Sequence, residues 1–364
     1  MKTKRSGLRT TLRCVLGLAL AILLLAGAGI GWLTLGEYRP APREAVPVAG
    51  TPVREARVGE ELRIVSWNIG YGALDASADF FMDGGKRVFT ADAAQVEANL
   101  SAIGARLHAL NPDLVLLQEV DRDSARSHRL DEEMRLAERL GDAQRAFAYN
   151  YHVDFVPFPW PPLGRVRSGL ATFSRLGMRE AARIQLPVPF SWPVRTANLK
   201  RCLLESRIPL AGTDRELVLI NLHLEAYDDG AGKAAQTQML LQCLQDEAAR
   251  GNYVIAGGDF NQTFPQIAPD RYPARAGLWQ PGVLDGEAFR RAGLLLVTDE
   301  AHPTCRSLDR PLRGADAEDF QYYAIDGFIL SGNVELLACS VIPEDFQASD
   351  HNPLLLRVRL KDLP

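Results

Sequence analysis

Six apolar runs in this chain end in, or lie next to, Asp, Asn, Glu or His. These residue types bind metal ions and transfer protons. The blocks are Trp67-Asn68, Gln118-Glu119, Asn221-Leu222-His223, Gly258-Asp259-Phe260-Asn261, Ile325-Asp326-Gly327 and Ser349-Asp350-His351. An α/β scaffold presents reactive groups where its strands end. Strands that end at the same edge would therefore gather these side chains into one site.

Each block also has a structural explanation when it is taken alone. Asn68 could occupy a turn, His223 could be a hydrogen-bonded structural histidine, and Asp350 could cap a turn. The six blocks in this order are harder to explain as unrelated structural features.

Taken together, the blocks WN, QE, NLH, GDFN, IDG and SDH resemble the endonuclease/exonuclease/phosphatase superfamily over about residues 62–360. GDFN and SDH are the more specific of them. The resemblance implies the deoxyribonuclease-I-like fold, a four-layer α/β/β/α sandwich with two central mixed sheets. It also implies Mg²⁺-dependent phosphodiesterase or phosphatase activity, with the site at one end of the sheets.

The resemblance makes Glu119 the main metal ligand, assisted by Asn68, with Asp350 adding a direct or water-mediated contact. Mg²⁺ is the expected ion and Mn²⁺ the alternative. Because Mg²⁺ prefers oxygen ligands and keeps several waters, one or two carboxylates are enough to hold it.

The resemblance also implies roles in proton transfer. His351 would be the general base or a charged donor to the phosphate, and Asp326 would fix its tautomer. Asp259 would orient or deprotonate the attacking water, and the choice of base between Asp259 and His351 stays open. Asn261 and His223 would donate hydrogen bonds to phosphoryl oxygens. His223 could instead protonate the leaving group. Tyr227, Asn198, Lys200 and Arg201 are further candidates for substrate contacts.

Secondary structure that could position these residues follows from the apolar periodicity. Strands are expected at 62–67, 114–118, 169–173, 202–208, 216–224, 253–256, 324–330, 335–342 and 354–360, and helices at 91–110, 130–140 and 234–250. The two segments 155–165 and 186–196 are rich in Pro and aromatic residues, so both should be surface loops. They would be either rigid connectors or an apolar rim near the site or a membrane surface.

The N-terminus has the pattern of a membrane segment. Residues 1–14 form a basic stretch, and residues 15–35 are uncharged and long enough to cross a bilayer as a helix. Because positive flanks stay in the cytoplasm, the C-terminal part should lie outside it, in the periplasm or the extracellular space. A cleaved signal peptide is the alternative, since Ala26-Gly27-Ala28 offers a cleavage site. A linker at 36–60 and a catalytic domain at 61–364 would complete the chain. This makes the chain similar to a membrane-anchored bacterial-type member of the superfamily.

The charge distribution indicates which class of substrate the chain can bind. Residues 1–44 hold seven of the 41 basic residues and two of the 45 acidic ones, which leaves −9 for the rest of the chain. A non-specific nucleic-acid binder needs a surplus of Lys and Arg, so nucleic acid is disfavoured.

Four cysteines follow the anchor: Cys202, Cys243, Cys305 and Cys339. Their spacing excludes CxxC sites and leaves their disulfide pairing open.

The sequence therefore predicts a monomeric, membrane-anchored hydrolase that acts on a phosphodiester or phosphomonoester outside the cytoplasm. A phospholipid head group or a small phosphoester is the expected substrate. An extracytoplasmic nuclease is the alternative, and a non-catalytic binding module on the same fold is the third hypothesis.

Overall fold

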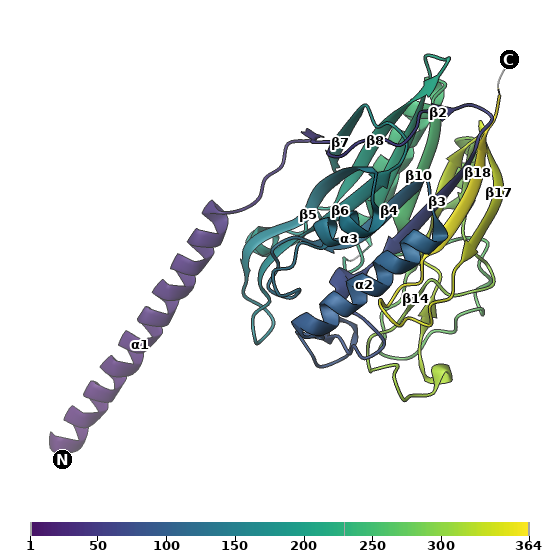
Figure 1. Ribbon diagram of the computed structural model, residues 1–364. Coiled ribbons are helices and arrows are strands. Elements are labelled where there is room, and N and C mark those ends of the chain that lie inside the picture. Colours follow the sequence, from purple (N-terminus) through teal and green to yellow (C-terminus); the bar gives the residue numbers. More distant parts are fainter. Residues whose placement is uncertain (1, 229, 363–364) are drawn as a thin grey trace.

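The computed structural model describes residues 2–228 and 230–362. Outside the described residues lie Met1, Asp229, Leu363 and Pro364; the predicted basic N-terminus begins at Met1, and the predicted catalytic domain ends at Pro364. The chain begins with one long helix, α1 (Lys2–Leu35), which projects away from the rest of the molecule (Figure 1). Its segment Thr10–Leu35 has a mean hydropathy of 2.5, and none of it is buried. Its length and composition are compatible with a membrane anchor.

Two β-sheets form the centre of the molecule. The larger has eight strands, in the order β1-β7-β8-β9-β10-β16-β13, with β2 pairing β8. Its strands are β1 (Arg43–Val46), β2 (Ala56–Arg57), β7 (Glu180–Gln185), β8 (Cys202–Ala211), β9 (Glu216–His223), β10 (Tyr253–Asp259), β13 (Leu294–Val297) and β16 (Asp326–Ser331). The pair β9–β10 is parallel and β10–β16 is antiparallel, so this sheet is mixed.

The smaller sheet has six strands, in the order β17-β18-β3-β4-β6-β5. They are β3 (Glu61–Asn68), β4 (Leu114–Asp121), β5 (Gln144–Val156), β6 (Gly164–Ser174), β17 (Val334–Val341) and β18 (Leu354–Leu360). The pair β3–β4 is parallel and its neighbours are antiparallel. Two short pairs lie outside the sheets: β11 (Gln262–Thr263) with β12 (Gly282–Val283), and β14 (Cys305–Arg306) with β15 (Tyr322–Tyr323).

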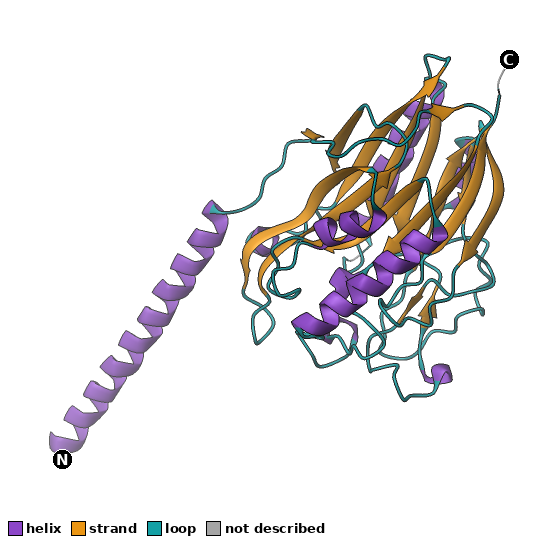
Figure 2. Ribbon diagram, viewed as in Figure 1, coloured by secondary structure: helices purple, strands orange, loops and turns teal. Residues whose placement is uncertain are grey.

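Helices cover the outer faces of both sheets (Figure 2). They are α2 (Ala93–Leu110), α3 (Glu132–Leu140), α4 (Ala231–Ala249) and α5 (Gly286–Arg291). The ends of α2 follow from its sequence: Asp92 caps the first turn by accepting from the Gln95 N–H, and Asn111 ends the helix in a left-handed conformation before Pro112. Short 3₁₀ turns occur at η1 (Gly70–Gly72), η2 (Phe81–Asp83), η3 (Val194–Ala197) and η4 (Ala317–Asp319).

Three apolar clusters hold the layers together. One lies between the sheets and includes Ile64, Leu116 and Ile255. A second joins the smaller sheet to α2 and α3, and a third joins the larger sheet to α4 and α5. These layers confirm the expected α/β/β/α sandwich with two mixed sheets after one N-terminal helix. Both sheets bury both faces, which explains the nearly continuous apolar runs of their central strands.

The structure differs from the sequence-based expectation in several regions, since the strands β7 and β13 and the helix α5 were also not predicted. The segment 36–60, expected to be a linker, contains β1 and β2 and lies along the larger sheet. Such packing depends mainly on backbone hydrogen bonds, which leave no side-chain periodicity. The 13-residue strand β5 was also not expected. Its register shifts twice against β6, and the shifts break the alternation of apolar residues.

All five cysteines have free thiols. Cys202 and Cys305 are buried, Cys243 and Cys339 are partly buried, and Cys14 is exposed on α1.

The predicted loop segments are loops in their central parts: residues 157–163 connect β5 to β6, and residues 186–193 precede η3.

Candidate active site

Strand register brings five of the polar blocks together at one end of the sandwich. Asp259 at the end of β10 pairs with His223 on one side and with Asp326 on the other. In the smaller sheet, Asn68 pairs with Gln118, which places Glu119 at the same end. Asn68 Nδ2 donates to Asp259 Oδ2 at 3.1 Å, so the ends of the two sheets meet at these side chains.

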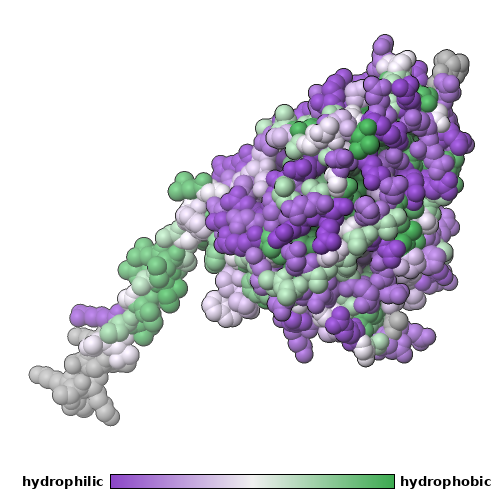
Figure 3. Space-filling view, viewed as in Figure 1, coloured by the Kyte–Doolittle hydropathy of each residue, from purple (hydrophilic) through white to green (hydrophobic). Residues whose placement is uncertain are grey.

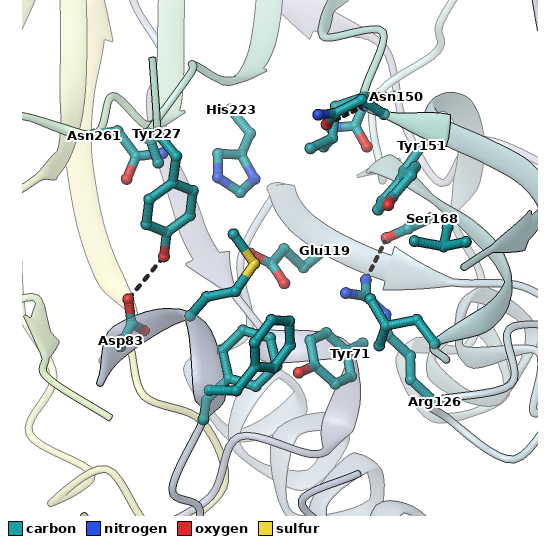
Figure 4. A pocket seen from close by; sticks show the side chains of 18 of the residues that line it. Tyr71, Asp83, Glu119, Arg126, Asn150, Tyr151, Ser168, His223, Tyr227 and Asn261 are labelled. Carbon is teal, nitrogen blue, oxygen red and sulfur yellow. Dashed lines mark hydrogen bonds between the residues drawn. The ribbon is translucent and has the colours of Figure 1, made fainter. Parts of the chain in front are cut away.

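Glu119 points into the site because β4 is irregular at this position. Its φ is +54°, and the register between β4 and β6 shifts between Leu117 and Val120. A bulge of this kind changes the direction of a side chain at a strand end. Figure 4 shows the Glu119 carboxylate in the middle of the pocket, between His223 and Tyr71. Its Oε1 lies 3.4 Å from Asn68 Nδ2.

His351 and Asp326 form a buried pair, with Nδ1 of the imidazole 2.8 Å from Oδ2 of the carboxylate. Burial alone would lower the pKa of His351, but the Asp326 carboxylate and a contact with Cys305 raise it well above its ordinary value. The ring is therefore protonated on both nitrogens, and its Nδ1–H donates to Asp326. Nε2 therefore faces the pocket, 3.8 Å from Asp259 Oδ2.

Asp259 is the most connected carboxylate of the site. Its Oδ2 lies 3.3 Å from His223 Nε2, and its Oδ1 accepts the backbone N–H of Asn261 at 2.9 Å. Burial, together with the neighbouring Asp326, raises the pKa of Asp259 to about 7. Gly258 allows this arrangement, because a Cβ at its position would lie 1.9 Å from the Leu222 carbonyl oxygen.

His223 and Asn261 flank Asp259. Burial, and next the positive charge of Arg201, lower the pKa of His223 well below its ordinary value, so its ring is neutral. Its Nδ1 is buried without a hydrogen-bond partner among the described residues. Asn261 has a left-handed backbone, with φ +50°, and its Nδ2 donates to the Leu224 carbonyl at 2.8 Å.

Asp350 completes the acidic cluster. It is buried beside Glu119, and burial raises its pKa to about 7, with the negative charge of Glu119 acting in the same direction. The preceding Ser349 fixes the loop, since its hydroxyl donates to the Asn68 carbonyl at 2.8 Å. Within the described residues, no Lys or Arg forms an ion pair with Asp350 or Glu119.

The chemistry of this donor set fits a divalent cation. Four carboxylates (Glu119, Asp259, Asp326 and Asp350) meet in this region, His351 pairs with Asp326, and Oδ1 of Asp326 is buried without a partner among the described residues. Uncompensated buried carboxylates are costly unless a positive ion joins them. Two groups have ligand atoms within 4.8 Å of one another: Asp259, Asp326 and His351, and Cys305, Asp350 and His351. We favour a cation near Glu119 and Asp350, because Asp326 and His351 already bind each other and a thiol is a poor Mg²⁺ ligand.

The orientation of Asn68 bears on its predicted role as a ligand. Its Oδ1 accepts the Gly70 N–H at 3.1 Å, while Nδ2 faces Glu119 and Asp259. In this orientation the amide supports the two carboxylates, and rotation of the amide by 180° would turn its oxygen toward them.

All eight predicted site residues lie in one region. Seven of them line a cavity of about 600 Å³: Asn68, Glu119, His223, Asp259, Asn261, Asp350 and His351. The eighth, Asp326, lies behind His351. Of the further candidates, Asn198, Arg201 and Tyr227 also line this cavity, whereas Lys200 pairs with Glu37 outside it.

Sequence reasoning missed several polar residues of the pocket, among them Arg126 and Asp83. Arg126 and Ser168 hydrogen bond to each other on one side of Glu119, and Asp83 accepts from the Tyr227 hydroxyl at 2.7 Å on the other side (Figure 4). Arg126 is held by both oxygens of Asp121, each at 3.0 Å. Neither Arg126 nor Asp83 follows an apolar run that would have marked it as a strand end.

A family model described as the Endonuclease/Exonuclease/phosphatase family matches residues 65–351. Among solved structures, an endonuclease/exonuclease/phosphatase from Beutenbergia cavernae is 21% identical over 84% of this chain and 72% of that chain, with a TM-score of 0.56. One from Bacteroides vulgatus is 15% identical over 83% of this chain and 100% of its own, with a TM-score of 0.54. ANGEL2, a 2',3'-cyclic phosphatase, is 15% identical over 88% of this chain and 99% of its own, with a TM-score of 0.52. No curated protein matches the sequence. At these identities the likeness to solved structures shows the fold.

Proposed function

This chain belongs to the Endonuclease/Exonuclease/phosphatase family, whose members hydrolyse phosphoester bonds, and from that premise we propose that it is a divalent-metal-dependent phosphoesterase held outside the cytoplasm by α1. The observation that carries the proposal is the convergence of a buried Asp326–His351 pair with Glu119, Asp259 and Asp350 in one cavity. The proposed ion is Mg²⁺, with Mn²⁺ as the alternative.

Glu119 and Asp350 would hold the ion, with Asn68 supporting them. A bound divalent ion offsets phosphate charge and stabilises the leaving oxygen. The side chains themselves supply the remaining functions. Asn261 has one N–H left after its bond to Leu224, and neutral His223 has one N–H to donate. Both therefore suit hydrogen bonding to phosphoryl oxygens better than protonation of a leaving group.

The proton assignment follows from the contacts of the two candidate bases. His351 already carries a proton on Nδ1 toward Asp326, and its Nε2 faces the pocket. We assign it the role of a charged donor to the phosphate. Asp259 then orients the attacking water and takes its proton, because Asn68 Nδ2 holds its Oδ2 at the pocket.

The acidic charge outside the N-terminal segment disfavours long nucleic acids. A phospholipid head group or a small phosphoester fits the proposed tether better. The positive residues before Thr10 support a cytoplasmic N-terminus under the positive-inside rule, with the domain on the other side of the membrane.

The test is hydrolysis of bis-p-nitrophenyl phosphate by the purified full chain in detergent. EDTA should abolish turnover, and added Mg²⁺ or Mn²⁺ should restore it. Asp259→Asn should lower kcat by about 10²-fold or more, the usual effect of losing a general base. Activity that survives EDTA would overturn the metal dependence, and full activity of Asp259→Asn would overturn its assigned role.

A further inference from the structure

The cavity has an apolar wall as well as a polar floor. Four segments far apart in the chain contribute it: the end of α1, the turn η2, the β5–β6 loop and the loop around η3. Representative lining residues are Ile30, Leu33, Phe81, Phe158, Leu163 and Val194. The polar residues that bind phosphate and metal in our proposal lie at the other end of the same cavity. The wall is much larger than hydrolysis of a small polar phosphoester requires.

The wall begins on the membrane anchor. Ile30 and Leu33 belong to the apolar segment Thr10–Leu35, whose exposed apolar surface reaches the edge of the domain (Figure 3). If α1 spans a bilayer, its last turns mark the level at which the lipid head groups begin. The cavity therefore opens at the depth of the membrane surface.

Exposed aromatic side chains surround this opening. Trp160 is 88% exposed and Phe158 73% exposed on the β5–β6 loop, and Trp192 is 54% exposed before η3. Two of the elements touch α1: Trp32 packs on Phe155 with ring centroids 6.5 Å apart, and Trp192 Nε1 donates to Thr34 Oγ1 at 3.1 Å. Trp residues concentrate at membrane–water interfaces. Three exposed aromatic residues beside an anchor are better explained by contact with lipid than by contact with water.

Ion pairs fix the end of α1 against the domain. The Glu37 side chain is only 3% exposed, and its Oε1 lies 3.2 Å from Arg195 Nε and 3.3 Å from Lys200 Nζ. The anchor and the apolar wall are thereby held in one arrangement.

Building on the phosphoesterase proposal, we infer that the substrate is a lipid phosphoester taken directly from the bilayer that holds α1. Its acyl chain lies along the apolar wall from Leu33 and Val194 inward, and its phosphate reaches Glu119 and His351. The continuity of the anchor, the aromatic rim and the wall selects a membrane lipid as the occupant. A nucleic acid would offer no apolar chain to this wall.

The test compares two phosphodiesters that share p-nitrophenol as the leaving group and differ only in chain length: ethyl and hexadecyl p-nitrophenyl phosphate. The full chain is reconstituted in phosphatidylcholine vesicles, and kcat/KM is measured for each ester. We expect the hexadecyl ester to be preferred by at least about tenfold, the effect of burying a few methylene groups.

Val194 and Val53 give a matched pair of variants. Val194 lines the cavity and is 58% exposed, whereas Val53 is 55% exposed and lies near Arg175 at the opposite end of the sheets. Val194→Asp should lower the hexadecyl-to-ethyl ratio at least fivefold, Val194→Leu should preserve it, and Val53→Asp should leave it unchanged. An ethyl ester hydrolysed as well as the hexadecyl ester, or a ratio insensitive to Val194→Asp, would overturn the inference while leaving the phosphoesterase proposal intact. Absence of turnover on both esters and on bis-p-nitrophenyl phosphate would overturn the phosphoesterase proposal itself.

Discussion

The side-chain amide of Asn68 donates to Asp259 across the interface of two β-sheets, with Nδ2 3.1 Å from Oδ2. Asn68 ends β3 in the smaller sheet, and Asp259 ends β10 in the larger one. The same amide faces Glu119. One neutral donor therefore bridges the carboxylate assigned to the metal and the carboxylate assigned to the water, and it fixes the distance between them.

Replacing Asn68 by Ala should lower kcat/KM on bis-p-nitrophenyl phosphate by roughly 10–100-fold. Hydrogen bonds to charged groups contribute about 1.5–3 kcal/mol, and each 1.4 kcal/mol is a factor of ten. Asn333→Ala is the control, because Asn333 also makes buried backbone bonds but lies at the far end of β16. Equal activity of the two variants would contradict the bridging role.

His351→Gln should reduce kcat by about 10²–10⁴-fold, since the variant loses the charged donor of the site. The chain offers a matched pair for comparison. His302 also pairs with an aspartate, with Nδ1 3.2 Å from Asp299 Oδ2, but its side chain is 54% exposed and lies outside the cavity. His302→Gln should keep wild-type kcat. A similar loss in both variants would show that His351 matters for folding alone.

The stability of the metal-free protein should fall as the pH rises from about 4 to 7. The pKa values of Asp259 and Asp350 are about 7 in the folded chain, against about 3.9 in an unfolded one. In this window the folded state keeps protons that the unfolded state has released, so the free energy of unfolding decreases with pH. A bound cation replaces those protons. Mg²⁺ should therefore raise Tm more near pH 8 than near pH 5.

Asp350→Asn isolates this effect. It should raise the Tm of the EDTA-treated protein near pH 8 and reduce the gain from Mg²⁺. Asp345→Asn, which removes an exposed carboxyl four residues after Val341, should change neither quantity. If Mg²⁺ gave the same gain in Tm at both pH values, the buried acids would not be linked to metal binding.

Gly258→Ala should destabilise the protein by about 3 kcal/mol or more. A Cβ would lie 1.9 Å from the Leu222 carbonyl oxygen, and the parallel pairing of β9 and β10 leaves no room for a shift. Gly212→Ala is the control: its φ is also positive, at +83°, but its position has open space, so about 1–2 kcal/mol is expected. Urea unfolding of both variants checks the difference. Equal losses would mean that backbone conformation, and not contact with Leu222, decides the cost.

The sequence predicted much of the fold because central strands buried on both faces leave long apolar runs, as in β4 and β10. Each predicted site residue ends, begins or lies close to such a run. Arg126 and Asp83 lie in loops, and only tertiary contacts bring them to the cavity, so no local pattern could identify them. β5 and the pairing of segment 36–60 were missed for a related reason, since bulges and backbone bonds leave no periodic signal. The aromatic loops were recognised, but their contact with α1 depends on the folded arrangement.

The most direct test of the proposed metal site is an anomalous diffraction map from a crystal of the full chain soaked in Mn²⁺. We expect an anomalous peak at metal–oxygen distance, about 2.1 Å, from carboxylate oxygens of Glu119 and Asp350. This peak should disappear in Glu119→Gln. A peak between Asp259, Asp326 and His351, or no peak in this cavity, would contradict the assignment of the metal site.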